Sequence, residues 1–378
     1  MSNLLNQGGF GCVYYPGITC KGNIRKKKKF VTKLQKLNFN SINEQEISNI
    51  IKTISNYKDY FIPIISSCEV NIKNVDNKSL SKCELISSKS NIKYVLMKSI
   101  FVNNTPFLEA IINTDDEKNE IFFNIIESYE YLLEAINILI KKNIVHFDLK
   151  FNNILFNSSN DTPQIIDFGI SIPFSKLDNS NIKKYFYIYA PDYYIWPLEV
   201  HVICFLLNTK KDNYTLTKKD ANDISKKMVF SNKALNIYSD NFKNQYLTAC
   251  ENELDKYVGI SSQENINNLQ KFYKTWDNYA VSIMYLKMYY YLFPSGFHRN
   301  SMIIKFSQLL LLNISPNPLK RLNIKDTKTS FYNIFNLNNI NIDTYTNIIK
   351  NMDYDITETT KNINEDMQQL NSKIKKII

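Results

Sequence analysis

Glycine is scarce in this 378-residue chain, and its eight glycines are unevenly placed. Five of them fall within the first 22 residues: Gly8, Gly9, Gly11, Gly17 and Gly22. Because glycine lets the backbone approach a ligand closely, this clustering predicts a flexible loop that covers bound phosphate. The spelling Gly-Gly-Phe-Gly is also common at hairpin tips, so the loop alone does not decide the function.

Cysteine and histidine are also sparse, and their spacing indicates no metal motif. The six cysteines include no C-x-x-C pair, and the three histidines, at positions 146, 201 and 298, are too far apart for a zinc motif. Scattered cysteines of this kind predict reduced thiols and a cytoplasmic protein. The apolar runs at 202–207 and 309–312 are much shorter than the roughly 18 to 20 residues that span a bilayer, so no membrane partner is expected.

The charge balance is basic, with a formal net charge of +10 at pH 7. Such a charge is compatible with nucleic-acid binding. However, the chain is rich in Asn, Lys and Ile, a bias typical of an AT-rich genome. The lysines that this bias supplies explain the positive charge as well as nucleic-acid binding would, and no nucleic-acid motif is present. A nucleic-acid partner is therefore not expected.

The most informative stretch runs from His146 to Leu155, spelled H-F-D-L-K-F-N-N-I-L, and Asp167-Phe168-Gly169 follows it. Phosphoryl transfer needs a carboxylate to orient the attacking hydroxyl, a cation near the phosphate, and oxygen ligands for Mg²⁺. Asp148 and Lys150 supply the first two. Asn153 and Asp167 supply hard oxygen ligands. Short apolar runs at 153–156 and 164–166 predict a hairpin that brings these ligands together.

These motifs resemble those of eukaryotic-type protein kinases, H-x-D-L-K-x-x-N-I-L and I-D-F-G. The resemblance implies an α+β, two-lobed protein-kinase fold, with a small β-rich N-lobe and a large helical C-lobe. It also implies ATP and Mg²⁺ as cofactors and proteins as substrates. The Asp-Leu-Lys spelling that includes Lys150 favours serine and threonine over tyrosine as acceptors.

The resemblance extends to the nucleotide contacts. Residues 6–13 align with the kinase G-x-G-x-x-G-x-V loop, although Asn6 replaces its first glycine. Residues 93–100 resemble the fifth strand and hinge, with Met97 as the gatekeeper. The family pattern therefore implies that ATP contacts Leu5, Gly8, Gly9, Phe10, Gly11, Val13, Val31, Lys33, Met97, Lys98, Ile100, Leu155 and Asp167.

Phe30-Val31-Thr32-Lys33 resembles the kinase V-A-I-K strand, which makes Lys33 the candidate contact for the α- and β-phosphates. The basic run of Arg25 and residues 26–29 competes with it, but only Lys33 follows an apolar pair of β type. A helix predicted over 42–54 offers two carboxylates as its partner, Glu44 and Glu46. The E-I-x-x-I pattern favours Glu46, so the implied catalytic set is Asp148, Lys150, Asn153, Lys33 and Glu46.

Three later matches concern support for such a site. Trp276-Asp277 resembles the start of the central helix of the large lobe, whose Asp holds the backbone of the catalytic loop. Arg321, in N-P-L-K-R, resembles the Arg that pairs with the Glu ending the activation segment. That Glu is Glu199 in the favoured alignment, with Ala190-Pro191-Asp192 as the competing site.

Two departures are visible. Phe147 replaces the Arg that usually precedes the catalytic Asp, which makes control by phosphorylation of the activation loop less expected. The stretch between Glu199 and Asp277 far exceeds the family's usual length of about a dozen residues, which predicts a helical insertion over about 209–272. The expected domains are a kinase domain over 1–323, with an N-lobe to about 100 and a C-lobe over 101–323, and a helical tail over 324–378 with a short amphipathic helix near 367–378. Apolar residues at helical spacing also predict a helix over 120–143, which leads into the catalytic motif.

The spellings G-G-F-G-C-V-Y-Y-P-G, F-V-T-K-L and Y-I-W-P-L-E-V-H resemble serine/threonine kinases of giant nucleocytoplasmic large DNA viruses. A viral origin would place the protein in the host cytoplasm or the virion. The function expected from the motifs is an ATP-dependent serine/threonine protein kinase. Two alternatives are a pseudokinase that binds partners, and a small-molecule phosphotransferase of the aminoglycoside or choline kinase type, which shares only H-x-D-x-x-x-x-N.

Overall fold

A computed structural model describes residues 2–7, 11–24, 28–75, 80–86, 92–102, 104–112, 118–210, 213–293, 301–335 and 356–375. The chain divides into two units, and each is discontinuous in sequence. Unit 1 comprises Met1–Pro106, Asn153–Ser171 and Asn371–Ile378, and unit 2 comprises Phe107–Asn152 and Ile172–Leu370.

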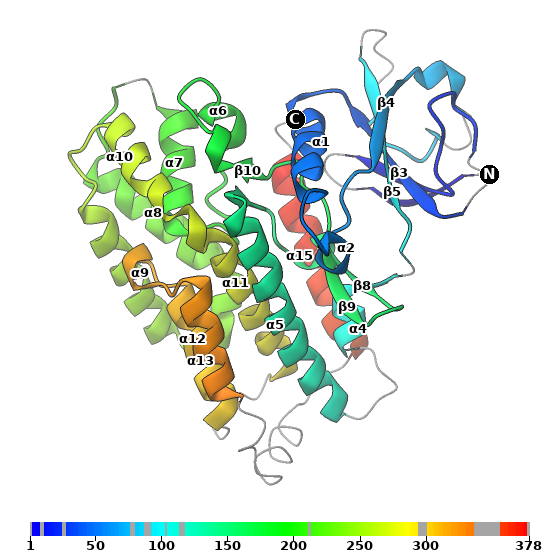
Figure 1. The fold of residues 1–378 in the computed structure, drawn as a ribbon. Helices are drawn as coiled ribbons and strands as arrows, with labels where there is room; N and C mark the ends of the chain where they lie inside the picture. Colours follow the sequence, from blue (N-terminus) through cyan, green and yellow to red (C-terminus); the bar gives the residue numbers. More distant parts are fainter. Residues whose placement is uncertain are drawn as a thin grey trace. The chain divides into compact units, whose positions relative to one another are not determined.

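Unit 1 is built on an antiparallel sheet of strand order β1-β2-β3-β5-β4, of which Figure 1 labels β3, β4 and β5. Its strands are β1 (Asn3–Gln7), β2 (Cys12–Tyr15), β3 (Phe30–Lys36), β4 (Ser66–Val70) and β5 (Tyr94–Ile100). One face buries a core cluster that includes Tyr14, Leu34 and Leu96. Because side chains alternate along a strand, Lys33 and its cross-strand neighbour Met97 lie on the opposite face.

Helix α1 (Phe39–Ile51) begins at a capping box. The side chain of Asn38 accepts a hydrogen bond from the backbone N–H of Ser41 at 3.1 Å, and the Ser41 hydroxyl accepts one from the N–H of Asn38 at 2.9 Å. The buried positions include Ser41, Ile47, Ser48 and Ile51, which share one face at helical spacing. The short helix α2 (Tyr57–Tyr60) follows.

A second sheet of unit 1 has the order β6-β8-β9, with β6 (Asn104–Pro106), β8 (Ile154–Asn157) and β9 (Thr162–Ile165). In the β8–β9 hairpin Ile154 pairs with Ile165, and the backbone N–H of Ile166 donates to the carbonyl oxygen of Asn153 at 3.0 Å. The hairpin predicted from the two apolar runs is confirmed.

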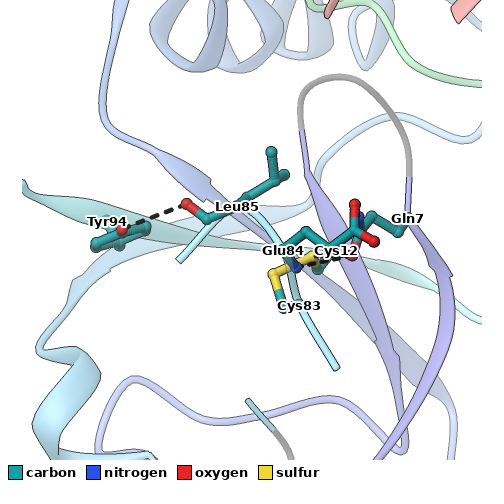
Figure 2. Close-up of a disulfide and its surroundings, with 6 residues drawn as sticks. All are labelled: Gln7, Cys12, Cys83, Glu84, Leu85 and Tyr94. Atoms are coloured by element: carbon teal, nitrogen blue, oxygen red, sulfur yellow. Dashed lines mark hydrogen bonds between the residues drawn. A yellow bond between two sulfur atoms is a disulfide. The ribbon is translucent and has the colours of Figure 1, made fainter. Parts of the chain in front are cut away.

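Two disulfides cross-link unit 1: Cys12–Cys83, which Figure 2 shows, and Cys20–Cys68. The expectation of reduced thiols was wrong for these four cysteines. The fold brings their Cα atoms to 6.0 and 5.9 Å, within disulfide range, although the partners are 71 and 48 positions apart in sequence. Beside the first bridge, the Gln7 amide donates to the Glu84 carboxylate at 2.7 Å. Cys204 and Cys250 are free and buried.

Unit 2 is organised around α11 (Trp276–Leu292), which is buried on nearly every side and is therefore an interior helix. Helices α5 (Lys118–Lys141) and α12 (Ser301–Asn313) pack on α11, and α13 (Ile324–Ile334) packs on both α5 and α12. Strand β7 (Ile144–Val145), just after α5, pairs with β10 (Ile172–Pro173). Helix α5 confirms the helix expected before the catalytic motif.

Most of the segment between positions 209 and 272 is helical in its described residues. Further helices of unit 2 are α4 (Phe107–Ile112), α6 (Ile182–Tyr185), α7 (Leu198–Thr209), α8 (Lys218–Ser231), α9 (Asp240–Asp255) and α10 (Ser262–Leu269). Short 3-10 turns are η1 (Ile72–Asn74), η2 (Phe151–Asn153), η3 (Phe174–Lys176), η4 (Lys233–Ile237), η5 (Gln270–Thr275) and η6 (Pro318–Lys320). The hydroxyl of Tyr246 in α9 donates to the carbonyl oxygen of Ile314 at 2.6 Å, so this segment is packed into unit 2.

The last helix, α15 (Ile356–Lys375), is longer than the short helix expected near Met367. Its side chains at Ile363, Met367 and Leu370 are buried at helical spacing, which explains the earlier start. Among the residues that the structure describes, no helix is both long and apolar enough to cross a membrane.

Candidate active site

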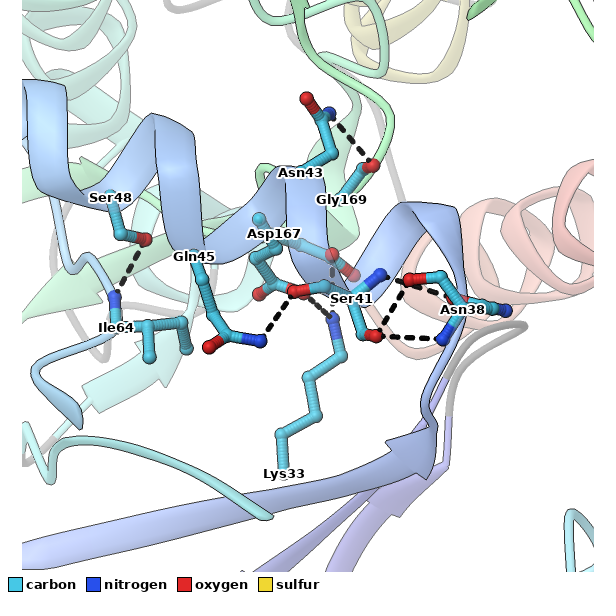
Figure 3. A network of polar contacts seen from close by, with 10 residues as sticks. Lys33, Asn38, Ser41, Asn43, Gln45, Ser48, Ile64, Asp167 and Gly169 are labelled. Atoms are coloured by element: carbon cyan, nitrogen blue, oxygen red, sulfur yellow. Dashed lines mark hydrogen bonds and ion pairs between the residues drawn. The ribbon is translucent and has the colours of Figure 1, made fainter. Parts of the chain in front are cut away.

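Lys33 is the centre of a polar group in unit 1. Its Nζ lies 2.9 Å from Oε2 of Glu44 and 2.8 Å from Oδ1 of Asp167, and its side chain is only 12% exposed. Burial opposes the positive charge, but attraction to Asp167 and Glu44 raises the pKa of Lys33 overall. The ammonium group therefore stays charged, and its contact with Asp167 is drawn in Figure 3.

The partner of Lys33 is Glu44, not the predicted Glu46. Two residues along a helix are separated by about 200°, so these carboxylates point to different sides of α1. Glu44 shares the buried face with Ser41 and Ser48, whereas Glu46 is exposed. The packed face of the helix therefore selects Glu44.

Helix α1 also fixes the backbone that follows Asp167. The side-chain amide of Asn43 donates to the carbonyl oxygen of Gly169 at 3.1 Å, as Figure 3 shows, and to that of Ser171 at 2.8 Å. Asp167 has a φ of 64°, a left-handed conformation that residues other than glycine seldom adopt. Such strain is typical of functional sites. Sequence reasoning missed Asn43, and a polar residue on the buried face of the helix was the only signal for it.

The two predicted Mg²⁺ ligands lie at the open end of the β8–β9 hairpin. Asn153 faces Ile166 across the ladder, and Asp167 is the next residue along the chain. An amide oxygen and a carboxylate are hard oxygen donors of the kind that Mg²⁺ prefers. The chemistry of the residues present therefore fits the ion.

Gly11 lies against Lys33. A Cβ atom at Gly11 would lie 2.8 Å from Cγ of Lys33 and 3.2 Å from the carbonyl oxygen of Leu34, so any side chain would displace Lys33. Strand alternation places Val13 and Val31 on the Lys33 face of the sheet. The other predicted loop contacts, Gly8, Gly9 and Phe10, lie outside the described residues, and Leu5 is an exposed residue of β1.

The remaining predicted nucleotide contacts lie in different parts of unit 1. Met97 is fully buried and packs with Ile64 and Val95. Lys98 and Ile100 lie on the face of the sheet opposite Lys33. The carbonyl oxygen of Lys98 accepts a hydrogen bond from the N–H of Ile65 at 2.8 Å, so it is used inside unit 1. Leu155 is half-buried in β8.

Unit 2 holds a second polar group, formed by Asp148, Lys150 and Tyr193. Nζ of Lys150 lies 2.9 Å from both carboxylate oxygens of Asp148 and 3.1 Å from the Tyr193 hydroxyl. That hydroxyl donates to Oδ1 of Asp148. Burial and the Asp148 charge raise the pKa of Tyr193 well above its usual value, so the tyrosine remains a neutral donor. Sequence reasoning missed Tyr193, because none of the motifs distinguishes it among 25 tyrosines.

The backbone before Asp148 is held by Asp277 at the start of α11. Its carboxylate accepts hydrogen bonds from the N–H of His146 at 2.7 Å and of Phe147 at 3.0 Å, as predicted. Burial raises the pKa of Asp277, and these two N–H groups oppose that rise. The two donors thus stabilise the buried carboxylate.

Phe147 occupies a strained and tightly packed position. Its φ is 71°, which is rare for a bulky residue. Its carbonyl oxygen accepts from the Trp196 indole N–H at 2.8 Å, and its ring stacks on Trp196 with centroids 4.7 Å apart. Phe147, which replaces the expected Arg, is therefore held in place by aromatic packing and a backbone hydrogen bond.

Arg321 binds Glu199, as the favoured alignment predicted. Nη1 and Nη2 of Arg321 lie 2.5 and 2.8 Å from Oε1 and Oε2 of Glu199, and both side chains are buried. The Trp276 indole N–H also donates to Oε1 at 2.9 Å. The pair is bidentate and well satisfied, which is the strong form of such a contact.

Comparison with known proteins gives two matches of the same kind. The chain is 24% identical over 277 residues to "Calcium-dependent protein kinase 4" of Plasmodium berghei (strain Anka), covering 60% of this chain and 52% of that protein. It is 26% identical over 275 residues to "Calcium-dependent protein kinase 4" of Plasmodium falciparum (isolate 3D7), with the same coverage of 60% and 52%. Both matches are distant similarities to protein kinases. No family model matches this chain.

The architecture of each unit is compatible with the kinase fold. Unit 1 carries the small antiparallel sheet, and unit 2 is larger and mainly helical. The chain spans about half the length of the curated kinases it matches. The relationship therefore supports kinase function at the level of the family.

Proposed function

We propose that the protein is an ATP-dependent serine/threonine protein kinase that phosphorylates hydroxyl groups of protein substrates. The observation that carries the proposal is the contact of one buried ammonium group, Lys33 Nζ, with both Glu44 and Asp167. A cation fixed in this way suits the α- and β-phosphates of a nucleotide. Asp167 would at the same time be placed to hold Mg²⁺ with Asn153.

The residues of unit 2 supply the groups that act on the acceptor. Asp148 orients the substrate hydroxyl and accepts its proton, and Lys150 offsets negative charge on the transferred group. Mg²⁺, when bound, neutralises charge on the phosphate oxygens. The D-L-K spelling at 148–150 supports serine and threonine as acceptors.

The test is phosphate transfer from γ-labelled ATP to generic protein acceptors by the purified chain. Asp148→Asn should lower kcat by on the order of 10²-fold or more, because it removes the general base. Asp161→Asn is the matched control. Asp161 is exposed, and its φ of 51° is one that asparagine adopts readily, so activity should stay within about twofold of wild type.

Three outcomes would contradict the proposal. Mg-ATP binding without transfer would favour a pseudokinase. Transfer to aminoglycosides or choline but not to proteins would favour a small-molecule phosphotransferase. Near wild-type turnover in Asp148→Asn would remove the role assigned to that carboxylate.

A further inference from the structure

Helix α15 brings a buried carboxylate, Asp366, into unit 2. Lys233 of η4 lies 2.8 Å from its Oδ1. Lys287 of α11 and the hydroxyl of Tyr194 both contact its Oδ2. The side chain of Asp366 is 3% exposed and that of Lys287 is 2% exposed. Three different parts of the unit therefore meet at one carboxylate.

The buried charges of Asp366 and Lys287 favour one way of packing α15 in unit 2. An unpaired buried ammonium is strongly disfavoured, so Lys287 requires a carboxylate partner. Burial tends to raise the pKa of Asp366, but the two lysines and Tyr194 lower it overall, and the carboxylate stays ionised. Asp366 shares its helix face with Ile363, Met367 and Leu370, so apolar burial and charge pairing select the same orientation of α15.

The segment around Tyr194 connects this contact to the catalytic carboxylate. Tyr193 and Tyr194 are adjacent; Tyr193 donates to Asp148, and Tyr194 donates to Asp366. Backbone hydrogen bonds from Tyr193 to Ala190 at 2.9 Å and from Trp196 to Tyr193 at 3.1 Å keep the segment in a compact turn. The two tyrosines therefore lie on one compact turn, with one hydroxyl at Asp148 and the other at Asp366.

We propose that Asp366 is a positioning residue for phosphoryl transfer, which holds Asp148 in place through Tyr194 and Tyr193. The inference rests on the proposed kinase function and extends it to the C-terminal helix. Asp148 lies in a water-poor setting where the Tyr193 hydroxyl and Lys150 fix its orientation. A displacement of about 1 Å in a reacting group can cost up to about 10²-fold in rate, so a remote contact of this kind affects turnover.

The first experiment compares two neighbouring acids of α15. Asp366→Asn removes the buried charge, and Glu365→Gln makes the same change at an exposed position one residue away. Asp366→Asn and Tyr194→Phe should each lower kcat about fivefold to tenfold. The KM for ATP should stay within about twofold of wild type, because the polar group assigned to the nucleotide, around Lys33, lies in unit 1. Glu365→Gln should match wild type. Rates are measured below the melting temperature of every variant.

A double variant separates positioning from stability. Lys287→Met with Asp366→Leu replaces the buried ion pair by apolar side chains, a change that often restores or increases stability. It does not restore the acceptor for Tyr194. The melting temperature should therefore recover while kcat stays low. Recovery of both together would mean that Asp366 has a structural role only and would overturn the proposal.

Amide hydrogen exchange supplies a readout that needs no kinase activity. In Asp366→Asn, peptides covering 190–197 should exchange faster than in Glu365→Gln. Equal exchange in the two variants, or equal kcat in an active protein, would overturn this inference alone. A wild type without any phosphate transfer would instead overturn the kinase function, and with it the catalytic role of Asp366.

Discussion

Lys33 carries a charge that the interior of unit 1 must neutralise. Removing an ammonium group from water costs several kcal/mol unless carboxylates and hydrogen bonds replace the lost hydration. Glu44 from α1 and Asp167 from the segment after β9 both approach within 3 Å. The single ammonium group thus connects a helix to the backbone that carries a predicted metal ligand.

A comparison of two acids of α1 tests this contact. Glu44→Gln should lower kcat/KM by about 10- to 100-fold, because a hydrogen bond between charged groups contributes about 1.5 to 3 kcal/mol. Glu46→Gln alters an exposed carboxylate and should stay within about twofold of wild type. Initial rates with Mg-ATP give the ranking, and thermal shift verifies folding. The reverse ranking would restore Glu46 as the partner.

Short motifs drew attention to Lys33 and Asp167, which the structure brings together, but the motif-based choice of Glu46 over Glu44 was wrong. Both acids fit the spacing of an amphipathic helix. The choice depends on which face of α1 is buried, and this is set by packing against segments distant in sequence. The contact of Asn43 with Gly169 is of the same kind, since its partners are 126 positions apart.

His201 should make the folded protein sensitive to acid. Burial lowers its pKa to about 4, against the attraction of Asp192, from about 6.5 in the unfolded chain. Between these two values only the unfolded chain binds the proton, so stability is lost as pH falls from about 6.5 to about 4. The difference amounts to about 3 kcal/mol.

Urea unfolding of wild type and His201→Leu from pH 7 to pH 4 measures this contribution. The variant lacks the titrating group, so the gap in unfolding free energy between the two proteins should change by about 3 kcal/mol across the range. Other titrating groups cancel in the comparison. A gap that is constant with pH would show that His201 does not titrate in this window.

At the scale of elements, local sequence patterns predicted individual helices and hairpins, but they did not predict contacts between segments distant in sequence. The β8–β9 hairpin follows from two apolar runs and the turn between them, and α5 follows from helical spacing of apolar residues. The disulfides were not predictable in this way. Cys12 and Cys83 meet within the core cluster of unit 1, and nothing in their spacing indicates it.

The disulfides should contribute measurably to the stability of unit 1. Cys12→Ser with Cys83→Ser opens a loop of 71 positions, which in the chain-entropy account costs up to about 4 kcal/mol. Cys204→Ala changes a buried free thiol and removes no cross-link, so it serves as the control. Peptide mapping without reductant should recover the Cys12–Cys83 and Cys20–Cys68 pairs. Recovery of free thiols at these four positions would contradict the assignment.

At the scale of the whole molecule, the units do not follow the order of the sequence. The motifs suggested an N-lobe to about residue 100, a C-lobe to 323 and a separate tail. The structure groups residues 153–171 with the first unit through the pairing of β8 with β6, and it includes α15 as far as Leu370 in the second. Strand pairing and the Asp366 contacts decide this grouping, and neither leaves a signal in local sequence.

The two units should respond to different perturbations. Both disulfides belong to unit 1, whereas the buried Glu199–Arg321 pair belongs to unit 2. Glu199→Gln leaves Arg321 without its carboxylate and should destabilise unit 2 by about 3 to 5 kcal/mol, since breaking one side of a buried pair strands the other charge. Reduction with dithiothreitol should instead destabilise unit 1.

Hydrogen exchange resolved by peptide separates these effects. Glu199→Gln should accelerate exchange in α7 and α11 while β3 and β5 keep their protection, and dithiothreitol should produce the opposite pattern. Glu365→Gln, an exposed acid of unit 2, controls for loss of a charge alone. If either perturbation accelerated exchange equally in both units, the chain would unfold as one cooperative body, and the division into two units would have no thermodynamic counterpart.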